Sequence, residues 1–157
     1  MSSLRSIGPF VFFIALSLAA GAIGSVFTID QINSWYASLV KPSWTPPGAV
    51  FGPIWNILYV LMGSAAALVW TKGKFGRFFA IWVFVAHLVV NALWSIVFFA
   101  LHEVLLALLI IALLWVMIVI LIVLFARHSR LAAWLLVPYL LWVSYASTLN
   151  AGILFLN

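Results

Sequence analysis

Five long stretches without a charged side chain constrain this sequence more than any other feature. Each is longer than the ~20 residues that an α-helix needs to span the hydrocarbon core of a bilayer. Lipid admits only helices or closed β-barrels, and barrel strands are short segments of alternating polarity. We therefore predict an all-α integral membrane bundle of five transmembrane helices. The uncharged stretches cover residues 6–29, 42–71, 78–101, 104–126 and 131–157.

Composition excludes several classes of function. Hydrophobic residues make up 68% of the 157-residue chain and charged residues only 6%, whereas soluble domains carry about 25% charged residues. Cysteine is absent, which excludes disulfides, a thiolate nucleophile and Cys-ligated metal centres. We predict no metal site. The formal net charge is +5, but the positive residues stand singly or in small groups at segment ends, so we expect no nucleic-acid partner.

The chain is predicted to form a single domain, because short connections make successive helices antiparallel neighbours. A cleavable signal peptide is the alternative for the first segment, since Arg5 precedes an apolar run that reaches the small residues 19–22. The apolar character continues to Phe27, which favours a retained helix. The domain, residues 1–157, is expected to contain helices at about 6–28, 47–71, 78–101, 104–126 and 131–154.

Positive charges gather on one side of the predicted bundle. The other side carries Lys41 together with the acids Asp30 and Glu103. Cytoplasmic loops carry an excess of Lys and Arg, so we place the amino terminus inside and the first loop outside. No transit peptide is visible, which favours a prokaryotic cytoplasmic membrane over an organelle. The clustered positive residues are Arg5, Lys72, Lys74, Arg77, Arg127 and Arg130.

The first loop, residues 35–47, is rich in aromatic rings and proline. Proline fixes φ and restricts the residue before it, so this loop is expected to be stiff. We expect a short helix over residues 31–40, with Asp30 or Asn33 at its start, and Pro46 and Pro47 to open the second spanning helix. The rings suit either a membrane interface or the lid of an aromatic pocket.

Three of the predicted helices carry polar and aromatic side chains at helical spacing. Polar groups at membrane depth are costly and usually face the bundle interior. We expect Asn91 and Trp94 to face a ligand and His87 to pack structurally; axial ligation of haem by His87 is the alternative, but a clear second ligand is missing. Pro138 is expected to kink the fifth helix. The three stripes are His87, Asn91 and Trp94; Trp55, Tyr59 and Met62 with Asn56; and Pro138, Trp142, Ala146 and Asn150 with Tyr139 and Tyr145.

Conventional catalytic groups are scarce. Asp30 and Glu103 are the only acids, and both are expected to be solvated loop residues rather than a general acid/base pair. Small residues in the first two helices, among them Gly21, Gly24 and Gly63, favour tight helix packing or dimer contacts.

Several motifs in this chain occur in a recognisable order. They are Trp35-Tyr36, Lys41-Pro42-x-Trp44-x-Pro46-Pro47, Trp55, Asn91-x-x-Trp94, and Val137-Pro138-Tyr139-x-x-Trp142 followed by Ala146-x-Thr148-Leu149-Asn150. Together they resemble the signature of the TspO/translocator protein family, also called tryptophan-rich sensory proteins or peripheral-type benzodiazepine receptors. The resemblance covers nearly the whole chain. It implies a five-helix membrane protein, often a homodimer, that binds porphyrins, other tetrapyrroles and synthetic benzodiazepine-type ligands beneath the first loop.

The resemblance also implies which residues form the pocket. Some bacterial relatives break down protoporphyrin IX in light, with tryptophans at the positions of Trp55 and Trp142. No obligatory cofactor is implied; a porphyrin, as protoporphyrin IX or haem, would be ligand or substrate. The implied pocket residues are Trp35, Trp44, Pro47, Trp55, Asn91, Trp94, Tyr139, Trp142 and Ala146, to which we add Lys41 as a partner for the porphyrin propionates.

The preferred functional hypothesis is a tetrapyrrole-binding sensor or regulator. A light-dependent porphyrin-degrading enzyme is the first alternative, because the substrate itself absorbs the light and no acid/base machinery is needed. A transporter of porphyrin or of lipid, including sterol, is the second. The sequence argues mildly against transport, because five helices give no inverted repeat and no ionisable pair could couple an ion gradient. Sterol binding is disfavoured because the animal sterol motif ends in Lys or Arg, and no basic residue follows Tyr145.

Overall fold

The computed structural model describes residues 2–72 and 75–157. Within these residues the chain forms helices and connecting turns and no strand. Five helical segments are long and apolar enough to cross a bilayer, which confirms the predicted all-α five-helix membrane bundle. These segments are Ile7–Ile32, Gly48–Lys72, Arg77–Ala100, Val104–Ala126 and Arg130–Leu156.

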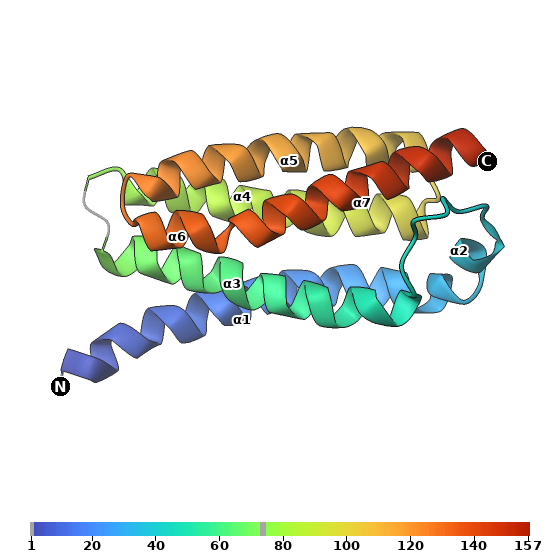
Figure 1. The fold of residues 1–157 in the computed structure, drawn as a ribbon. Helices are drawn as coiled ribbons and strands as arrows, with labels where there is room; N and C mark the ends of the chain where they lie inside the picture. Colours follow the sequence, from blue (N-terminus) through green and yellow to red (C-terminus); the bar gives the residue numbers. More distant parts are fainter. Residues whose placement is uncertain (1, 73–74) are drawn as a thin grey trace.

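The long helices run side by side, and the amino-terminal part of α1 extends away from the others (Figure 1). Helix α1 packs against α3 and α4, while α5 packs against α4, α6 and α7. Most of the sequence-adjacent helices are therefore also neighbours in space, as the short connections require. The elements are α1 (Ser2–Ile32), α2 (Trp35–Ser38), the 3₁₀ turn η1 (Gly48–Val50), α3 (Phe51–Lys72), α4 (Arg77–Ser95), the π-helical turn η2 (Ile96–Ala100), α5 (Val104–Ala126), α6 (Arg130–Leu135) and α7 (Val137–Leu156).

Helices α1 and α3 approach closely at Gly63. A Cβ atom built on Gly63 would lie 2.5 Å from Ile14 Cα and 2.7 Å from the carbonyl oxygen of Phe13. Residues 65–67, all alanine, are fully buried beside this contact. Lipid tails are as apolar as the helices themselves, so association depends on close backbone packing at small residues. This part of the structure agrees with the packing role predicted for the small side chains.

The outer surface is largely apolar, and several polar side chains of the spanning helices are buried inside the bundle. Helix α5 exposes Leu109 and Leu113 but buries Leu114 and Ile118, so one side faces lipid and the other faces the bundle. The buried polar side chains make hydrogen bonds, as burial away from water requires. Among the described residues, the buried polar side chains are Ser17, His87, Asn91 and Asn150.

The short helix of the first loop is smaller than predicted. Helix α2 covers Trp35–Ser38 rather than residues 31–40. Asp30 does not cap it, because Asp30 lies near the end of α1 and its carbonyl accepts a hydrogen bond from Ser34 Oγ at 2.7 Å. The absence of charge predicts an end for the first helix at about residue 28, just before Asp30. A helix can extend beyond the hydrocarbon core of the bilayer where its backbone groups still find hydrogen-bond partners, and α1 extends in this way.

The fifth spanning segment is divided into α6 and α7 at Leu136. The Leu136 N–H donates to the carbonyl of Ala133 at 3.1 Å. Pro138 lies in the first turn of α7, where its missing N–H leaves no helical bond unmade. The predicted fifth span is found as one apolar span, Arg130–Leu156, with a single-residue interruption two positions before Pro138. The interruption lies where a proline in a helix interior would clash with the carbonyl four residues earlier.

Replacing Gly63 with alanine is expected to destabilise the bundle by about 1–3 kcal/mol, because the added methyl group would press on the backbone of α1. Gly52→Ala is the matched control in the same helix, since a Cβ there meets nothing within 4 Å. We expect that control to be neutral or slightly stabilising, because alanine is the better helix former. Reversible unfolding in mixed detergent micelles measures both free energies. Equal stabilities would contradict the packing role of Gly63.

Candidate functional site

Residues 35–47, called the lid from here on, lie across one end of the bundle beside the end of α7 (Figure 1). The Val40 N–H donates to Asn157 Oδ1 at 3.0 Å, and Asn157 Nδ2 donates back to the Val40 carbonyl at 2.9 Å. Pro42 is buried against Gly152 of α7, where a Cβ would collide with the proline ring. These contacts hold the middle of the lid on α7.

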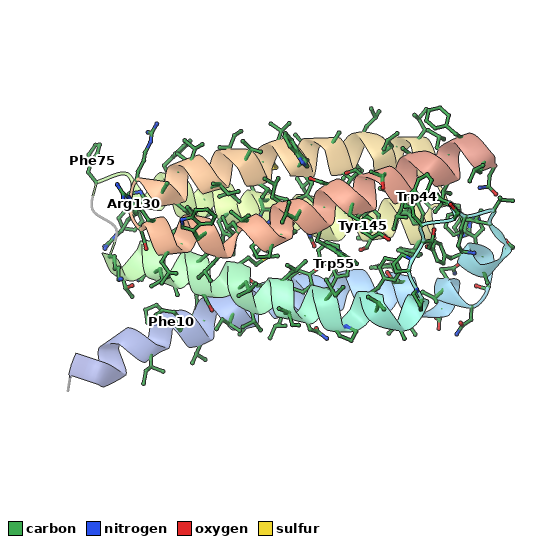
Figure 2. All side chains as sticks on the ribbon, viewed as in Figure 1. Phe10, Trp44, Trp55, Phe75, Arg130 and Tyr145 are labelled. Atoms are coloured by element: carbon green, nitrogen blue, oxygen red, sulfur yellow. The ribbon has the colours of Figure 1, made fainter. Side chains whose placement is uncertain are left out.

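Trp44 provides a second attachment between the lid and α7. Its indole Nε1 donates to Thr148 Oγ1 at 3.2 Å, and its carbonyl accepts from the Tyr145 hydroxyl at 2.6 Å. Figure 2 shows Trp44 at the lid end of the molecule, with Trp55 and Tyr145 further toward the middle. The aromatic rings of the lid are thus used for contacts within the protein as well as for a membrane interface.

Helix α2 rests on the turn between α4 and α5. Trp35 stacks on His102 with 4.1 Å between ring centroids and 13° between planes. The edge of Phe98 meets Trp35 at 5.4 Å. Tyr36 lies beside these rings, and its burial, with a smaller contribution from Tyr145, raises the pKa of its phenol above the ordinary value. Tyr36 is therefore a neutral hydrogen-bonding group at physiological pH.

Lys41 is engaged within the lid itself. Its Nζ donates to the carbonyls of Leu39 at 3.1 Å and Ala37 at 3.3 Å. The same atom lies 4.9 Å from the centroid of the Tyr36 ring, a cation–π distance. These contacts orient the ammonium group toward the lid backbone.

A cavity of about 540 Å³ lies beneath the lid, between α1, α3, α4 and α7. Its lining contains no charged side chain among the residues that the structure describes. The aromatic lining residues are Tyr36, Phe51, Trp55, Tyr59, Trp94, Phe98 and Phe99, and the polar ones include Ser25, Thr28, Asn56, Ser95 and Asn150. A cavity with this lining suits a flat, largely apolar molecule with a few hydrogen-bonding groups.

The π-helical turn at the end of α4 shapes one wall of this cavity. In η2 the Leu101 N–H reaches back to the Ile96 carbonyl at 3.1 Å. The wider turn changes the angular spacing of successive side chains, so the consecutive residues Phe98 and Phe99 both border the cavity. Such π turns are rare and concentrate at functional sites.

Trp55 and Tyr59 form the opposing wall on α3. Their rings stack with 5.6 Å between centroids and 28° between planes. Trp55 also contacts Tyr139 of α7 at 6.1 Å with the rings at 68°. Gly21 of α1 provides the space for Tyr59, because a Cβ at this position would collide with the phenol ring. The small residues of α1 therefore shape the cavity wall as well as packing the helices.

A hydrogen-bonded chain leads from this wall into the bundle. The Tyr59 hydroxyl donates to Asn91 Oδ1 at 2.7 Å, and Asn91 Nδ2 donates to the Tyr139 oxygen at 2.9 Å. His87 Nε2 lies 2.9 Å from that oxygen, and His87 Nδ1 lies 3.1 Å from the carbonyl of Phe84. Both ring nitrogens of His87, which is fully buried, are thus engaged in hydrogen bonds.

The residues predicted to bind a ligand are distributed over four environments, the last of which holds Trp142 alone. Trp55, Trp94 and Ala146 line the cavity. Asn91 and Tyr139 belong to the chain behind its wall. The lid holds Trp35, Lys41, Trp44 and Pro47, none of which is a lining residue.

Trp142 lies away from the cavity lining. It borders a separate apolar groove between α3 and α7, together with Ile54 and Tyr145. Its ring meets that of Phe51, a cavity residue, at 5.8 Å. Its buried Nε1 has no hydrogen-bond partner among the described residues. Trp142 is thus separated from the cavity by one aromatic side chain.

Several cavity residues were not among the predicted ligand contacts. Tyr59, Asn56 and Asn150 stand in the stripes noted from the sequence, and their spacing was the available signal. Phe98 and Phe99 gave no signal, because a regular helix would not turn both toward one site. Tyr36 was part of the recognised motif, but its direction depends on how α2 lies on the bundle.

Comparison with known proteins identifies close relatives. A model of the TspO/MBR family matches residues 13–156. The chain is 45% identical over 148 residues to a protein named tryptophan-rich protein TspO from Chlorobaculum tepidum, with 92% of each chain covered. It is 41% identical over 140 residues to a protein of the same name from Archaeoglobus fulgidus, with 89% of this chain and 91% of that one covered. It is 37% identical over 140 residues to human translocator protein, with 82% and 78% covered.

Replacing Tyr145 with phenylalanine is expected to loosen the lid, because the bond to the Trp44 carbonyl is lost. A net contribution of about 1 kcal/mol for one hydrogen bond corresponds to roughly fivefold faster local opening. Amide hydrogen exchange of residues 35–47 measures this rate. Ser147→Ala is the matched control, because Ser147 Oγ bonds only the Val143 carbonyl of its own helix. Unchanged exchange in Tyr145→Phe would show that other contacts hold the lid.

Proposed function

The chain belongs to the TspO/MBR family, and we propose that it is an integral membrane receptor that binds a tetrapyrrole beneath the lid. One observation carries this proposal, namely an aromatic, uncharged cavity between the helices under a hydrogen-bonded lid. The cavity volume of about 540 Å³ falls within the roughly 300–1,000 Å³ of small-molecule sites. A porphyrin macrocycle is large, flat and apolar, and it therefore suits walls made of aromatic rings.

The lining supports one orientation of such a ligand. Trp55 and Tyr59 face the space from α3, while Trp94 and Phe98 face it from the α4 side. The macrocycle would occupy the space between these rings. Its propionates would point toward the polar lid, because burying a carboxylate without a charged partner is strongly unfavourable.

A light-dependent breakdown of protoporphyrin IX is the second candidate function. Trp55 on the cavity wall is the observation that favours it, since an indole in contact with an excited macrocycle is readily oxidised. Trp142 contacts Phe51 of the cavity lining at 5.8 Å between ring centroids, so the second tryptophan lies one aromatic ring away from the ligand space. Illumination of the bound complex in air tests this candidate, and an unchanged porphyrin absorption spectrum would exclude it. Transport of porphyrin or lipid has no comparable supporting observation in the described residues.

Location and assembly are part of the same proposal. We place the protein in a prokaryotic cytoplasmic membrane with its amino terminus inside. We also propose that it forms a homodimer whose outer helices face lipid. The lid end of the bundle carries Lys41, whereas Arg130 lies at the opposite end (Figure 2). Lys72, Arg77 and Arg127 lie at helix ends on the same side of the bundle as Arg130. This gathering of positive charge supports that side of the bundle as the cytoplasmic one.

Replacing Trp55 with phenylalanine is expected to weaken protoporphyrin IX binding about fivefold, since about 1 kcal/mol of aromatic contact is lost. A titration of the detergent-purified protein in the dark, followed by tryptophan fluorescence, measures the affinity. Trp82→Phe is the matched control, because Trp82 is 70% exposed on α4. A parent protein without saturable quenching would overturn the tetrapyrrole proposal. Equal losses in the two variants would place the ligand outside the cavity.

Replacing Lys41 with alanine separates two roles for this side chain. A pairing with propionates would weaken binding of the porphyrin diacid and spare its dimethyl ester. Because the Lys41 ammonium is bound to two lid carbonyls, we expect instead a small loss, about twofold, that is equal for both ligands. Parallel titrations with the diacid and the diester measure the difference. A loss confined to the diacid would restore the propionate role.

A further inference from the structure

The direction of each hydrogen bond behind the cavity wall follows from the groups involved. A carbonyl oxygen only accepts, so the proton of the neutral His87 ring lies on Nδ1 and points to the Phe84 carbonyl. His87 Nε2 is then an acceptor, and the Tyr139 hydroxyl must donate to it. Tyr139 can accept from Asn91 at the same time. The chain thus runs in one direction, from Tyr59 at the cavity to His87 in the interior.

Two phenols in this chain contact the same indole but donate to different acceptors. Tyr59 and Tyr139 lie 5.6 Å and 6.1 Å from Trp55 between ring centroids. The Tyr59 hydroxyl donates to a carboxamide oxygen, which does not take up a proton under ordinary conditions. The Tyr139 hydroxyl donates to an imidazole nitrogen, which does. Of these two phenols, only Tyr139 can therefore transfer its proton to the group that accepts its hydrogen bond.

His87 differs from the other two histidines because it lies within a membrane-spanning segment. The five uncharged stretches contain no Asp, Glu, Lys or Arg, and of the three histidines only His87 falls within one of them. His87 and Tyr139 are both fully buried. Ionisable groups at membrane depth are expensive to retain, and they commonly take part in proton movement. A purely structural bond between α4 and α7 would need only an acceptor and not a base.

We propose that Tyr139 and His87 form a redox pair that returns an electron to Trp55 after Trp55 has been oxidised. The proposal rests on the proposed function, because the oxidant is a photoexcited tetrapyrrole in the cavity. Dioxygen is the terminal electron acceptor. The pair restores the indole of the cavity wall and moves the oxidising equivalent to a buried phenol away from lipid.

The electrons and protons balance in two steps. Trp55 first loses one electron, which passes through the excited ligand to dioxygen and yields superoxide. Tyr139 then gives one electron to Trp55, and its O–H bond breaks as the proton moves along the hydrogen bond to His87 Nε2. Because Nδ1–H remains on the Phe84 carbonyl, the imidazole becomes an imidazolium. In sum, Tyr139 loses one electron to dioxygen and one proton to His87, and Trp55 is unchanged.

Three variants separate this role from a structural one. Tyr139→Phe removes the phenol that is oxidised, whereas Tyr59→Phe removes the phenol that also contacts Trp55 but donates to a carboxamide. Because Tyr59 lines the cavity, the two variants are compared at equal porphyrin loading. His87→Gln keeps an oxygen that can accept from Tyr139 but removes the base. Unfolding in detergent and a porphyrin titration in the dark establish that each variant is folded and loaded.

Electron paramagnetic resonance of samples illuminated in air with protoporphyrin IX bound measures the radical. We expect a tyrosyl signal in the parent protein and in Tyr59→Phe, and its loss in Tyr139→Phe. In His87→Gln we expect the signal to fall about tenfold or more, because transfer to a positioned base is removed. A tyrosyl signal that survives in Tyr139→Phe, or that Tyr59→Phe abolishes, would overturn the proposal. Detection of tryptophan radicals without a tyrosyl radical in the porphyrin-loaded parent protein would also overturn the proposal.

A second excitation route tests the pair without the ligand. Ultraviolet light ionises tryptophan directly, with dioxygen again taking the electron. The same dependence on Tyr139 and His87, and independence of Tyr59, is expected. If the porphyrin does not bind, the proposed function fails, but this route still decides the redox pair. If the porphyrin binds and neither route gives a radical on Tyr139, the redox pair fails while the binding function stands.

Discussion

The cost of leaving a polar group unpaired in lipid determines most of this structure. It requires helices, because only a helix satisfies the backbone of a single spanning segment. It also requires partners for the polar side chains that are buried, and Asn91 and Asn150 each bond to a neighbouring helix. Since lipid provides no hydrophobic drive between helices, these bonds and the backbone contact at Gly63 specify which helices are neighbours. The cavity is the space that this arrangement leaves under the lid.

The same requirement explains how the lid is held. At the end of the bundle the chain leaves helical structure, and its backbone groups need other partners. Side chains of α7 and of the residue that follows it supply several of them: Tyr145 bonds the carbonyl of Trp44, and Asn157 bonds both backbone groups of Val40. Proline removes further donors from the same segment, which lowers the number of groups to be satisfied. The motif that is richest in Trp and Pro thus lies largely outside the helices, at one end of the bundle.

The sequence predicts the spanning helices well because the absence of charge over 20 or more residues has one physical meaning in a bilayer. It also places Trp55, Trp94 and Ala146 on faces that do line the cavity. Helical spacing shows that residues share a face, but not which neighbour that face meets. Trp142 therefore follows the predicted stripe and yet borders a different groove. The end of α1, the restart at α7 and the π turn that turns Phe98 and Phe99 inward depend on backbone bonds that leave little trace in the amino-acid pattern.

Helix α7 joins the lid, the cavity and the buried hydrogen-bonded chain in one rigid element. Thr148 and Asn157 hold the lid, Ala146 and Asn150 line the cavity, and Tyr139 lies behind its wall. The lid can rise only if its bonds to α7 break or if α7 moves with it. Movement of α7 would disturb the contact between Tyr139 and Trp55 and the bond from Tyr139 to His87. Lid position, cavity shape and the geometry of the buried chain are therefore mechanically linked, because the same 20-residue helix supplies a side chain to each.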